Sequence, residues 1–204
     1  MILITRPIKQ AIATQQELEF RGYNSVVYPL LEIHTENFEV DFSKYDAAII
    51  TSQNAAEIVR AKLNNIPLFL VGAESATILH DKNIQCVAQD AKELLAKIKN
   101  YPYKNYLYLS GDHISTKINA ERKIVYRSVA VTKLPKEILE YVTCVLFYSA
   151  RTAETFAKLI GNYNLNKCKA LCISQKIAEK IVHLNWESID VAKKPNEASL
   201  LSLL

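Results

Sequence analysis

Short polar turns that directly follow apolar runs contain the residue types in this chain that could bind a ligand. Within Asp46 to Leu63, the apolar residues 47–50 lead into the turn Thr51 to Asn54, and a segment with apolar positions three or four apart follows. This order predicts a buried strand, a turn and an amphipathic helix. Backbone N–H groups at a helix start lack partners and lie at the positive end of the helix dipole, so the turn suits an anion.

The same design recurs near residue 150, which indicates an internal duplication. Residues 143–160 match the first stretch in pattern, with Ser52 opposite Ser149 and Ala56 opposite Ala153. Further segments pair in the same way, namely 69–79 with 171–181, 87–95 with 191–201, and Tyr28 with Tyr126. Self-similarity of this kind predicts two similar α/β domains.

Apolar runs and helix-forming segments alternate along the whole chain. We expect strands at 2–5, 25–33, 47–50, 67–71, 86–88, 106–109, 124–131, 145–147, 170–173 and 188–191. We expect helices at 8–21, 55–63, 76–80, 91–99, 113–122, 150–160, 177–183 and 197–204, with 133–141 a connection or short helix. This alternation predicts parallel sheets covered by helices on both faces. Ligands bind at the carboxyl ends of such strands, and two facing edges would form a cleft.

Composition excludes several classes of protein. The chain has 204 residues and a formal net charge of +4, and its charges are interspersed rather than gathered into the basic stripe of a nucleic-acid-binding face. No apolar run approaches the roughly 20 residues of a membrane span, and Met1 leads directly into a strand-like segment with no signal peptide. The four cysteines form no CxxC pair, which indicates reduced thiols of a cytoplasmic protein. Neither cysteine nor histidine spacing predicts a metal site.

The residues alone leave the chemistry of the site open. The chain contains no GxSxG, P-loop, GxGxxG or HExxH motif, and no pair of nucleophile and base stands out. Each polar turn could simply cap a helix, and Tyr126 could simply pack its ring in a strand. Arg6 and Arg151 could be surface charges, and Lys176 could bind a carboxylate or face water. The direct interpretation is a soluble two-domain α/β protein with a small anionic ligand.

Beyond this point the sequence resembles the uroporphyrinogen-III synthase family over nearly its whole length. The matching segments, in order, are ILITRP, PLLEI, IITSQNAAE, FLVGAESA, YLSGDH, IVYRSVAV around Tyr126, and LFYSARTAETF. Where the family commonly has a Gly-Pro-Thr-Thr-Ala-like turn, this chain has Ser174 to Ala178. The threonine hydroxyls of that turn are therefore absent here.

The resemblance implies two similar α/β domains joined by a two-stranded linker, with a cleft between them. Residues 1–34 and 135–204 would form one discontinuous domain, with 38–131 inserted as the second. It also implies an enzyme, a hydro-lyase type of lyase in haem biosynthesis, that cyclises hydroxymethylbilane to uroporphyrinogen III with loss of water and inversion of ring D. No cofactor and no metal are implied. The expected protein is a cytoplasmic monomer without nucleic-acid or membrane partners, compatible with transient contact with the preceding pathway enzyme.

The resemblance also implies roles for individual residues. Tyr126 matches the tyrosine that the family favours as proton donor to the departing hydroxyl. The eight carboxylates of the linear tetrapyrrole would be bound by the polar turns, and the substrate-binding candidates are Thr5, Arg6, Ser52, Gln53, Asn54, Gly72, Ser75, Gly111, Asp112, Ser149, Ala150, Arg151, Ser174 and Lys176. The alternatives are a non-enzymatic two-lobed protein that binds a small anion and a nucleotide-dependent transferase, for which a phosphate loop is missing.

Overall fold

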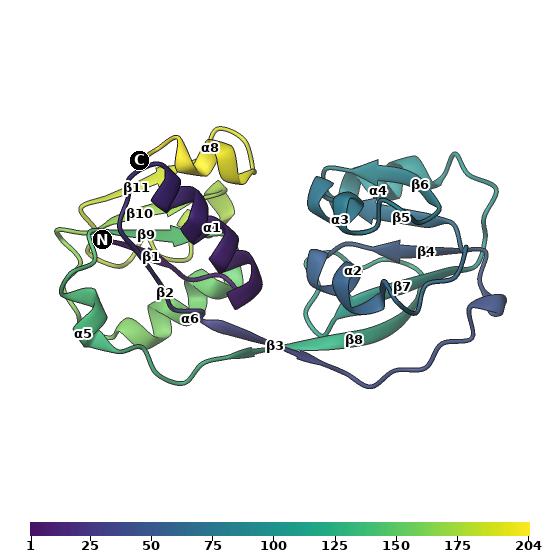
Figure 1. The fold of residues 1–204 in the computed structure, drawn as a ribbon, viewed down its shortest axis with the longest axis horizontal. Helices are drawn as coiled ribbons and strands as arrows, with labels where there is room; N and C mark the ends of the chain where they lie inside the picture. Colours follow the sequence, from purple (N-terminus) through teal and green to yellow (C-terminus); the bar gives the residue numbers. More distant parts are fainter. The chain divides into compact units, whose positions relative to one another are not determined.

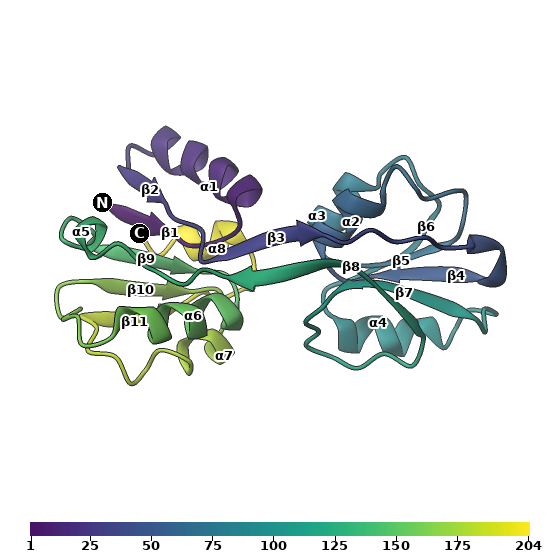
Figure 2. The same ribbon diagram turned by 90° about the horizontal axis from the view of Figure 1, so that it is seen from below.

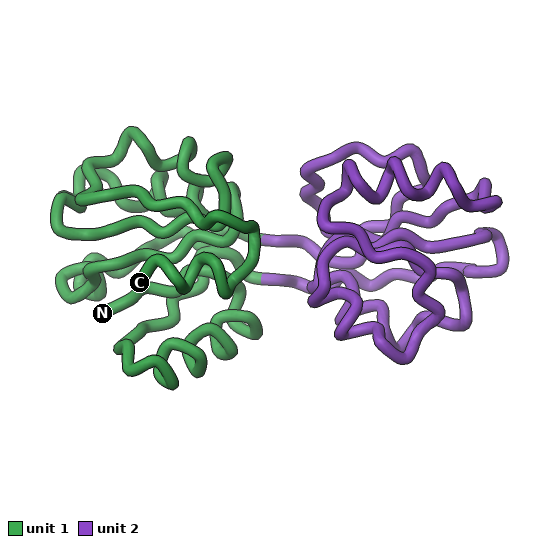
Figure 3. The backbone as a smooth tube through the Cα atoms, turned by 90° about the horizontal axis from the view of Figure 1, so that it is seen from above, with its two compact units in different colours: residues 1–32, 129–204 green, residues 33–128 purple.

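The computed structural model describes residues 1–204, which divide into two compact units. Unit 1 consists of residues 1–32 and 129–204, and unit 2 consists of residues 33–128 (Figure 3). Each unit contains one sheet with helices on both of its faces, as Figure 1 shows. The predicted class, parallel sheets flanked by helices in two α/β domains, is confirmed.

Unit 1 is built on a five-stranded parallel sheet with the order β11-β10-β9-β1-β2. Its strands are β1 (Ile2–Ile4), β2 (Ser25–Val27), β9 (Cys144–Phe147), β10 (Lys169–Cys172) and β11 (Ser188–Val191). Its helices are α1 (Ile8–Phe20), α5 (Lys136–Leu139), α6 (Ala150–Ile160), α7 (Gln175–Ala178) and α8 (Glu197–Leu201). The N-terminal strand β1 therefore lies inside the sheet, between β2 and β9.

Unit 2 is built on a six-stranded sheet with the order β3-β8-β7-β4-β5-β6. Its strands are β3 (Leu31–Thr35), β4 (Ala47–Ile50), β5 (Leu68–Val71), β6 (Ile84–Ala88), β7 (Tyr106–Gly111) and β8 (Glu121–Ala130). Its helices are α2 (Gln53–Val59), α3 (Ala73–Ile78) and α4 (Ala91–Ile98), with a 3-10 turn, η1 (Phe42–Lys44). The chain enters unit 2 through β3 and leaves through β8, which lie side by side in Figures 1 and 2.

The two sheets share one strand order, which supports the predicted duplication. Read from one edge, β2-β1-β9-β10-β11 of unit 1 corresponds to β8-β7-β4-β5-β6 of unit 2. The correspondence places β9 on β4 and β10 on β5, as the sequence pairs do. Strand β3 has no counterpart in unit 1. It pairs antiparallel with β8, since Glu36 N donates to Val125 O and Val131 N donates to Leu30 O.

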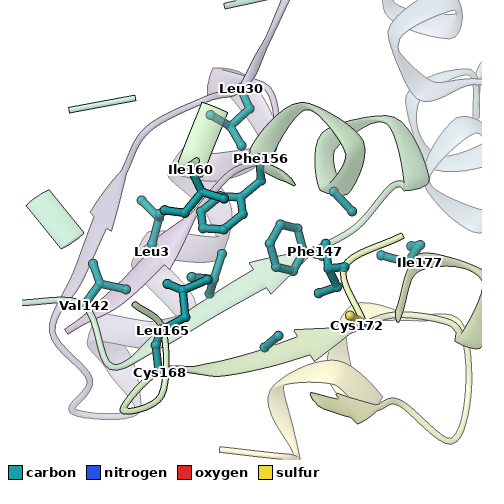
Figure 4. Close-up of a cluster of buried hydrophobic side chains, with 14 of the residues drawn as sticks. Leu3, Leu30, Val142, Phe147, Phe156, Ile160, Leu165, Cys168, Cys172 and Ile177 are labelled. Carbon is teal, nitrogen blue, oxygen red and sulfur yellow. The ribbon is translucent and has the colours of Figure 1, made fainter. Parts of the chain in front are cut away.

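Alternation along the strands divides each unit into two apolar layers. In β1, Leu3 belongs to the layer under α6, and Ile2 and Ile4 belong to the layer under α1 and α8. Figure 4 shows the first of these layers, in which Phe147 and Phe156 meet edge to face with centroids 5.3 Å apart. Because each face of each sheet is covered, the strand ends and the turns that follow them remain as the places for polar side chains.

Several expectations about elements were wrong, and four of them bear on the site. The expected strand 25–33 is interrupted at Tyr28 to Leu30, because Pro29 lacks an N–H, and its second half pairs in the other sheet. The expected helix 113–122 is an irregular loop at 113–120 and the start of β8 at 121–122, since its His, Ile, Ser, Thr and Asn residues are weak helix formers. Strand β7 extends through Ser110 and Gly111, and β8 begins three residues earlier than expected, at Glu121 rather than Ile124.

Candidate active site

The predicted substrate-binding residues gather at the carboxyl ends of neighbouring parallel strands, in two separate sets. The set in unit 2 follows β4, β5 and β7, which are adjacent strands, and comprises Ser52, Gln53, Asn54, Gly72, Ser75, Gly111 and Asp112. The set in unit 1 follows β1, β9 and β10, which are also adjacent, and comprises Thr5, Arg6, Ser149, Ala150, Arg151, Ser174 and Lys176. Tyr126 belongs to unit 2, on β8.

A hydrogen bond between Ser52 and Tyr126 is the central contact of the unit 2 set. The Ser52 Oγ and Tyr126 Oη atoms lie 3.0 Å apart, and Tyr126 is 8% exposed. Ser52 occupies the N-cap position of α2 but makes no side-chain cap bond. Its counterpart Ser149 does cap its helix, accepting from Thr152 N at 3.1 Å. The two equivalent serines thus have different roles, because Ser52 bonds the phenol of Tyr126 whereas Ser149 caps its helix.

Gly111 provides the space that the Tyr126 ring occupies. A Cβ atom on Gly111 would lie 2.4 Å from Tyr126 Cζ and 2.7 Å from its Oη, distances that real Cβ atoms do not show. The two residues face each other just beyond a register shift between β7 and β8 at Ser110 and Gly111. Glycine is therefore needed here for close approach, so that the phenol can lie over the backbone of β7 and reach Ser52.

Arg122 and Asp112 hold the end of β7 in place. The Arg122 guanidinium donates from Nε to Ser110 Oγ at 2.8 Å and from a terminal nitrogen to Asp112 O at 2.8 Å and to Gly111 O. The Asp112 carboxylate accepts from Ser128 N at 3.1 Å and from His113 N at 3.0 Å. Asp112 thus ties the loop to β8. This structural role suits its carboxylate, whereas binding an anionic substrate would bring like charges together.

A second tyrosine that is hydrogen-bonded to a neighbouring hydroxyl lies on the opposite face of the unit 2 sheet. Thr51 Oγ1 and Tyr108 Oη are 2.8 Å apart, and Tyr108 belongs to the apolar layer under α4 whereas Tyr126 belongs to the layer under α2. Burial raises the pKa of Tyr108 above its ordinary value, with the Thr51 bond and Arg122 acting in the opposite sense. Tyr108 therefore resembles Tyr126 in chemistry and in partner but not in location.

Thr5 and Arg6 of the unit 1 set are both engaged inside that unit. The Thr5 side chain is fully buried and donates to Leu146 O at 2.7 Å, which joins β1 to β9. Arg6 donates to Glu197 Oε1 at 2.9 Å and to Thr14 Oγ1 at 3.2 Å, and its guanidinium carbon lies 4.0 Å from the centre of the Tyr148 ring. Arg6 is thus a bound cation on an aromatic face, not an isolated surface charge.

The carboxylate of Glu197 accepts hydrogen bonds from three side chains at one oxygen. Besides Arg6, Thr14 Oγ1 donates to Oε1 at 2.5 Å and Tyr148 Oη donates to it at 2.9 Å. Burial, followed by the nearby Glu197 charge, raises the pKa of Tyr148, so this phenol stays protonated and acts as a donor. The cluster links α1, β9 and α8 around one carboxylate.

Five residues of these clusters were missed in the sequence: Thr14, Tyr108, Arg122, Tyr148 and Glu197. Two of them had a usable signal, because Tyr108 lies near the end of the predicted strand 106–109 and Tyr148 directly follows the predicted strand 145–147. Thr14 and Glu197 had none, because they are distant in sequence and meet only in the folded unit. Arg122 had none, because its contacts with Ser110, Gly111 and Asp112 cross an irregular loop.

The other predicted residues differ in exposure. Ser75 is buried within α3, and Gly72 precedes this helix with φ of 87°, a value that favours glycine. Lys176 is exposed at the start of α7, and Arg151 is half-buried in the first turn of α6. No group of three or more His, Cys, Asp or Glu side chains is arranged to hold a metal ion. None of the helices is both long enough and apolar enough to cross a membrane.

Fold and site together define a two-domain α/β protein whose polar turns and buried phenol stand at the carboxyl ends of parallel strands. A family model described as uroporphyrinogen-III synthase HemD matches residues 12–202. The chain belongs to the uroporphyrinogen-III synthase family. It is an enzyme of haem biosynthesis that acts on a tetrapyrrole substrate, and its reaction is the cyclisation of hydroxymethylbilane to uroporphyrinogen III.

Individual relatives are distant in sequence. A protein of Methanocaldococcus jannaschii with the provisional name uroporphyrinogen-III synthase is 24% identical over 188 residues, covering 79% of this chain and 78% of the relative. The crystal structure of uroporphyrinogen-III synthetase from Helicobacter pylori is 20% identical, covers 99% of this chain and 96% of that chain, and has a TM-score of 0.69. A mutant uroporphyrinogen III synthase from Thermus thermophilus is 14% identical with the same coverage and a TM-score of 0.53. These two structures share the fold.

Proposed function

We propose that Tyr126 donates the proton to the hydroxyl group that leaves hydroxymethylbilane. The 3.0 Å bond to Ser52 is the observation that carries this proposal, because it fixes the phenol at the carboxyl edge of the sheet. Ser52 can accept from Tyr126 or donate to it, so the phenol can turn its proton toward a substrate oxygen while keeping this partner. Gly111 allows this placement and Arg122 secures Gly111.

The chemistry of the substrate explains why one donor and good positioning suffice. The linear tetrapyrrole loses its terminal hydroxyl readily and closes by itself to the isomer with ring D not inverted. The enzyme must hold ring D so that attack occurs at the substituted carbon, which leads through a spiro intermediate to the inverted product. Selecting one of two closures is a matter of orientation and of differential binding of one transition state.

We propose that the substrate carboxylates are met by the polar turns of both units. Arg151 and Lys176 supply cations in unit 1, and Ser174 begins α7 without capping it. In unit 2, Gln53, Asn54 and the glycine turn at Gly72 lie beside Ser52 at the same sheet edge. Charge-assisted hydrogen bonds from such groups suit carboxylates. The Thr5 hydroxyl and the Asp112 carboxylate are left out of this set, since both are bonded inside their own units.

Replacing Tyr126 with phenylalanine tests the proposal, with Tyr108→Phe as its matched control. Each change removes one phenol oxygen that is bonded to a neighbouring hydroxyl, at 3.0 Å and 2.8 Å respectively, from opposite faces of one sheet. We expect Tyr126→Phe to lower kcat about 100-fold, the low end of positioned acid catalysis, because this substrate ionises unaided. Tyr108→Phe should turn over like the wild type.

Product isomers sharpen this measurement. With Tyr126→Phe in excess over freshly made hydroxymethylbilane, the inverted isomer should still form, because ring D is still held. With little enzyme, the non-inverted isomer should accumulate as spontaneous closure overtakes the slow variant. Wild-type turnover by Tyr126→Phe, or equal losses in both variants, would remove Tyr126 as proton donor and leave positioning alone as the mechanism.

We also propose that the enzyme works as a monomer in the cytoplasm. One chain supplies both sets of polar turns and the tyrosine, so the proposed site needs no residue from a second copy. The interspersed surface charges and the free thiols fit this setting. A single species of 23.1 kDa in sedimentation is the expected result.

A further inference from the structure

The Arg6 cluster of unit 1 has the composition of a carboxylate-binding site and already contains a carboxylate. A guanidinium, a phenol and a threonine hydroxyl converge on the single oxygen Oε1 of Glu197, at 2.9, 2.9 and 2.5 Å. Three donors on one carboxylate oxygen are a strong arrangement, because each bond is charge-assisted. Arg6 lies in the turn between β1 and α1, Thr14 in the middle of α1 and Tyr148 directly after β9, whereas Glu197 comes from the C-terminal helix α8.

The exposure of the pair shows from which side the site can be reached. The Arg6 side chain is 14% exposed and the Glu197 side chain is 36% exposed, so the guanidinium lies beneath and the carboxylate lies on the solvent side. Glu197 is the first residue of a five-residue helix, and residues 193–196 before it are exposed. A second carboxylate could therefore approach the three donors along the path that Glu197 occupies.

Charges at the carboxyl edge of the unit 1 sheet also favour an anion. Four of its five strands are followed within four residues by a cation: Arg6 after β1, Arg151 after β9, Lys176 after β10 and Lys193 after β11. The corresponding positions of unit 2 carry acids instead: Glu74 after β5, Asp90 after β6 and Asp112 after β7. The duplicated edges thus differ in sign, and the unit 1 edge is the one whose charges favour a polycarboxylate, whereas unit 2 offers neutral polar turns.

We infer that Arg6, Thr14 and Tyr148 form a binding site for one carboxylate of the substrate, which Glu197 fills when substrate is absent. The inference rests on the proposed function, because the substrate is a polycarboxylate. Binding exchanges one carboxylate for another on the same three donors. Glu197 therefore competes with the substrate and weakens its apparent affinity, and it keeps a nearly buried guanidinium paired while the site is empty.

Glu197→Gln tests this competition, because glutamine keeps the size of the side chain and an acceptor oxygen but loses the charge. The probe is uroporphyrin I, a stable porphyrin with eight carboxylates, whose Kd for the full-length protein is measured by fluorescence. We expect Glu197→Gln to lower the Kd about three- to fivefold, the worth of a partly exposed ion pair. KM for hydroxymethylbilane should fall by a similar factor with kcat unchanged.

The donor variants should act in the opposite direction. Arg6→Met should raise the Kd about tenfold or more, since it removes a hydrogen bond to a charged group, and Tyr148→Phe should raise it less. In the Arg6→Met background, Glu197→Gln should give no further gain. Glu17→Gln is the control, because it removes an ion pair of 2.7 Å to Arg21 at the far end of α1, and its Kd should match the wild type.

The outcomes separate this inference from the proposed role of Tyr126. Tyr126→Phe should bind uroporphyrin I like the wild type, so its failure as proton donor would leave the binding results intact. An unchanged or higher Kd for Glu197→Gln, in protein shown by its thermal unfolding to be folded at the assay temperature, would overturn the competition. A Kd unaffected by both Arg6→Met and Tyr148→Phe would overturn the carboxylate site itself.

Discussion

At the scale of single residues, the two serines at the duplicated helix starts show how one position acquires chemistry. The Ser149 hydroxyl accepts a hydrogen bond from the N–H of Thr152, as an N-cap side chain normally does. Ser52 leaves its helix uncapped by its side chain and bonds Tyr126 instead. Losing a side-chain cap lowers helix stability by about 1 kcal/mol, so we expect the Ser52–Tyr126 bond that replaces it to have a function. We assign that function to the reaction.

Gly111→Ala should remove the phenol from its place without touching its chemistry. The added Cβ would meet the Tyr126 ring at 2.4 Å, so the ring must move and its bond to Ser52 must break. We expect kcat to fall at least as far as in Tyr126→Phe, with some loss of stability measured by thermal unfolding. The double variant should be little worse than Tyr126→Phe in kcat, because both act on one hydroxyl. Additive losses in kcat would show that Gly111 acts otherwise.

Thiol reactivity gives a second prediction at this scale. Burial raises the pKa of Cys144, Cys168 and Cys172 to about 12, so at pH 8 these groups remain thiols, whereas the thiolate is the nucleophile. Cys86 is half-buried on β6. Iodoacetamide should therefore modify the native protein at Cys86 alone, as peptide mass spectrometry would show, and all four sites after unfolding. Early modification of Cys144 in native protein would contradict the buried arrangement of β9.

At the scale of elements, the sequence predicted the strands that are apolar on both faces and failed where a local pattern is ambiguous. The buried strand 47–50 was predicted with its observed bounds, because both faces of a parallel sheet need apolar residues. Segment 113–122 has two apolar residues at helical spacing, Ile114 and Ile118, but only Ile118 is buried. Ile118 anchors a loop, and the local sequence pattern does not distinguish such a loop from one turn of helix.

The candidate site was predictable in place but not in detail. The polar turns lie at the sheet edges where the strand order puts them. The sequence could not show that Arg6 binds Glu197, because 190 residues separate the two, nor that Arg122 supports Gly111 across the loop. Contacts of this kind depend on which strands are neighbours. That information is distributed over the whole chain.

At the scale of the whole molecule, the first strand of the chain belongs to the same sheet as the strands of its C-terminal part. Strand β1 pairs with β2 on one side and β9 on the other, although β9 follows 140 residues later. Leu3 and Ile4 are fully buried in the two apolar layers that β9 and β10 also contribute to. Unit 2, by contrast, is one continuous segment. Each unit is thus expected to depend on different parts of the chain for its stability.

Removing residues 1–30 should therefore unfold residues 135–204 and leave 38–131 folded. The cut spares β3, which begins at Leu31 and belongs to the unit 2 sheet, and it exposes the edge of β9 and the apolar layer that α1 covered. Hydrogen exchange read by mass spectrometry should show lost protection in β9 and β10 and retained protection in β4, β5 and β7. A chain with residues 1–30 reattached behind Leu204 through a flexible linker is the matched control, and it should regain protection in β9, because strand order rather than chain order determines the packing. Strong protection of β9 and β10 in the truncated chain would show that 135–204 folds without β1, and would overturn the assignment of residues 1–30 to that domain.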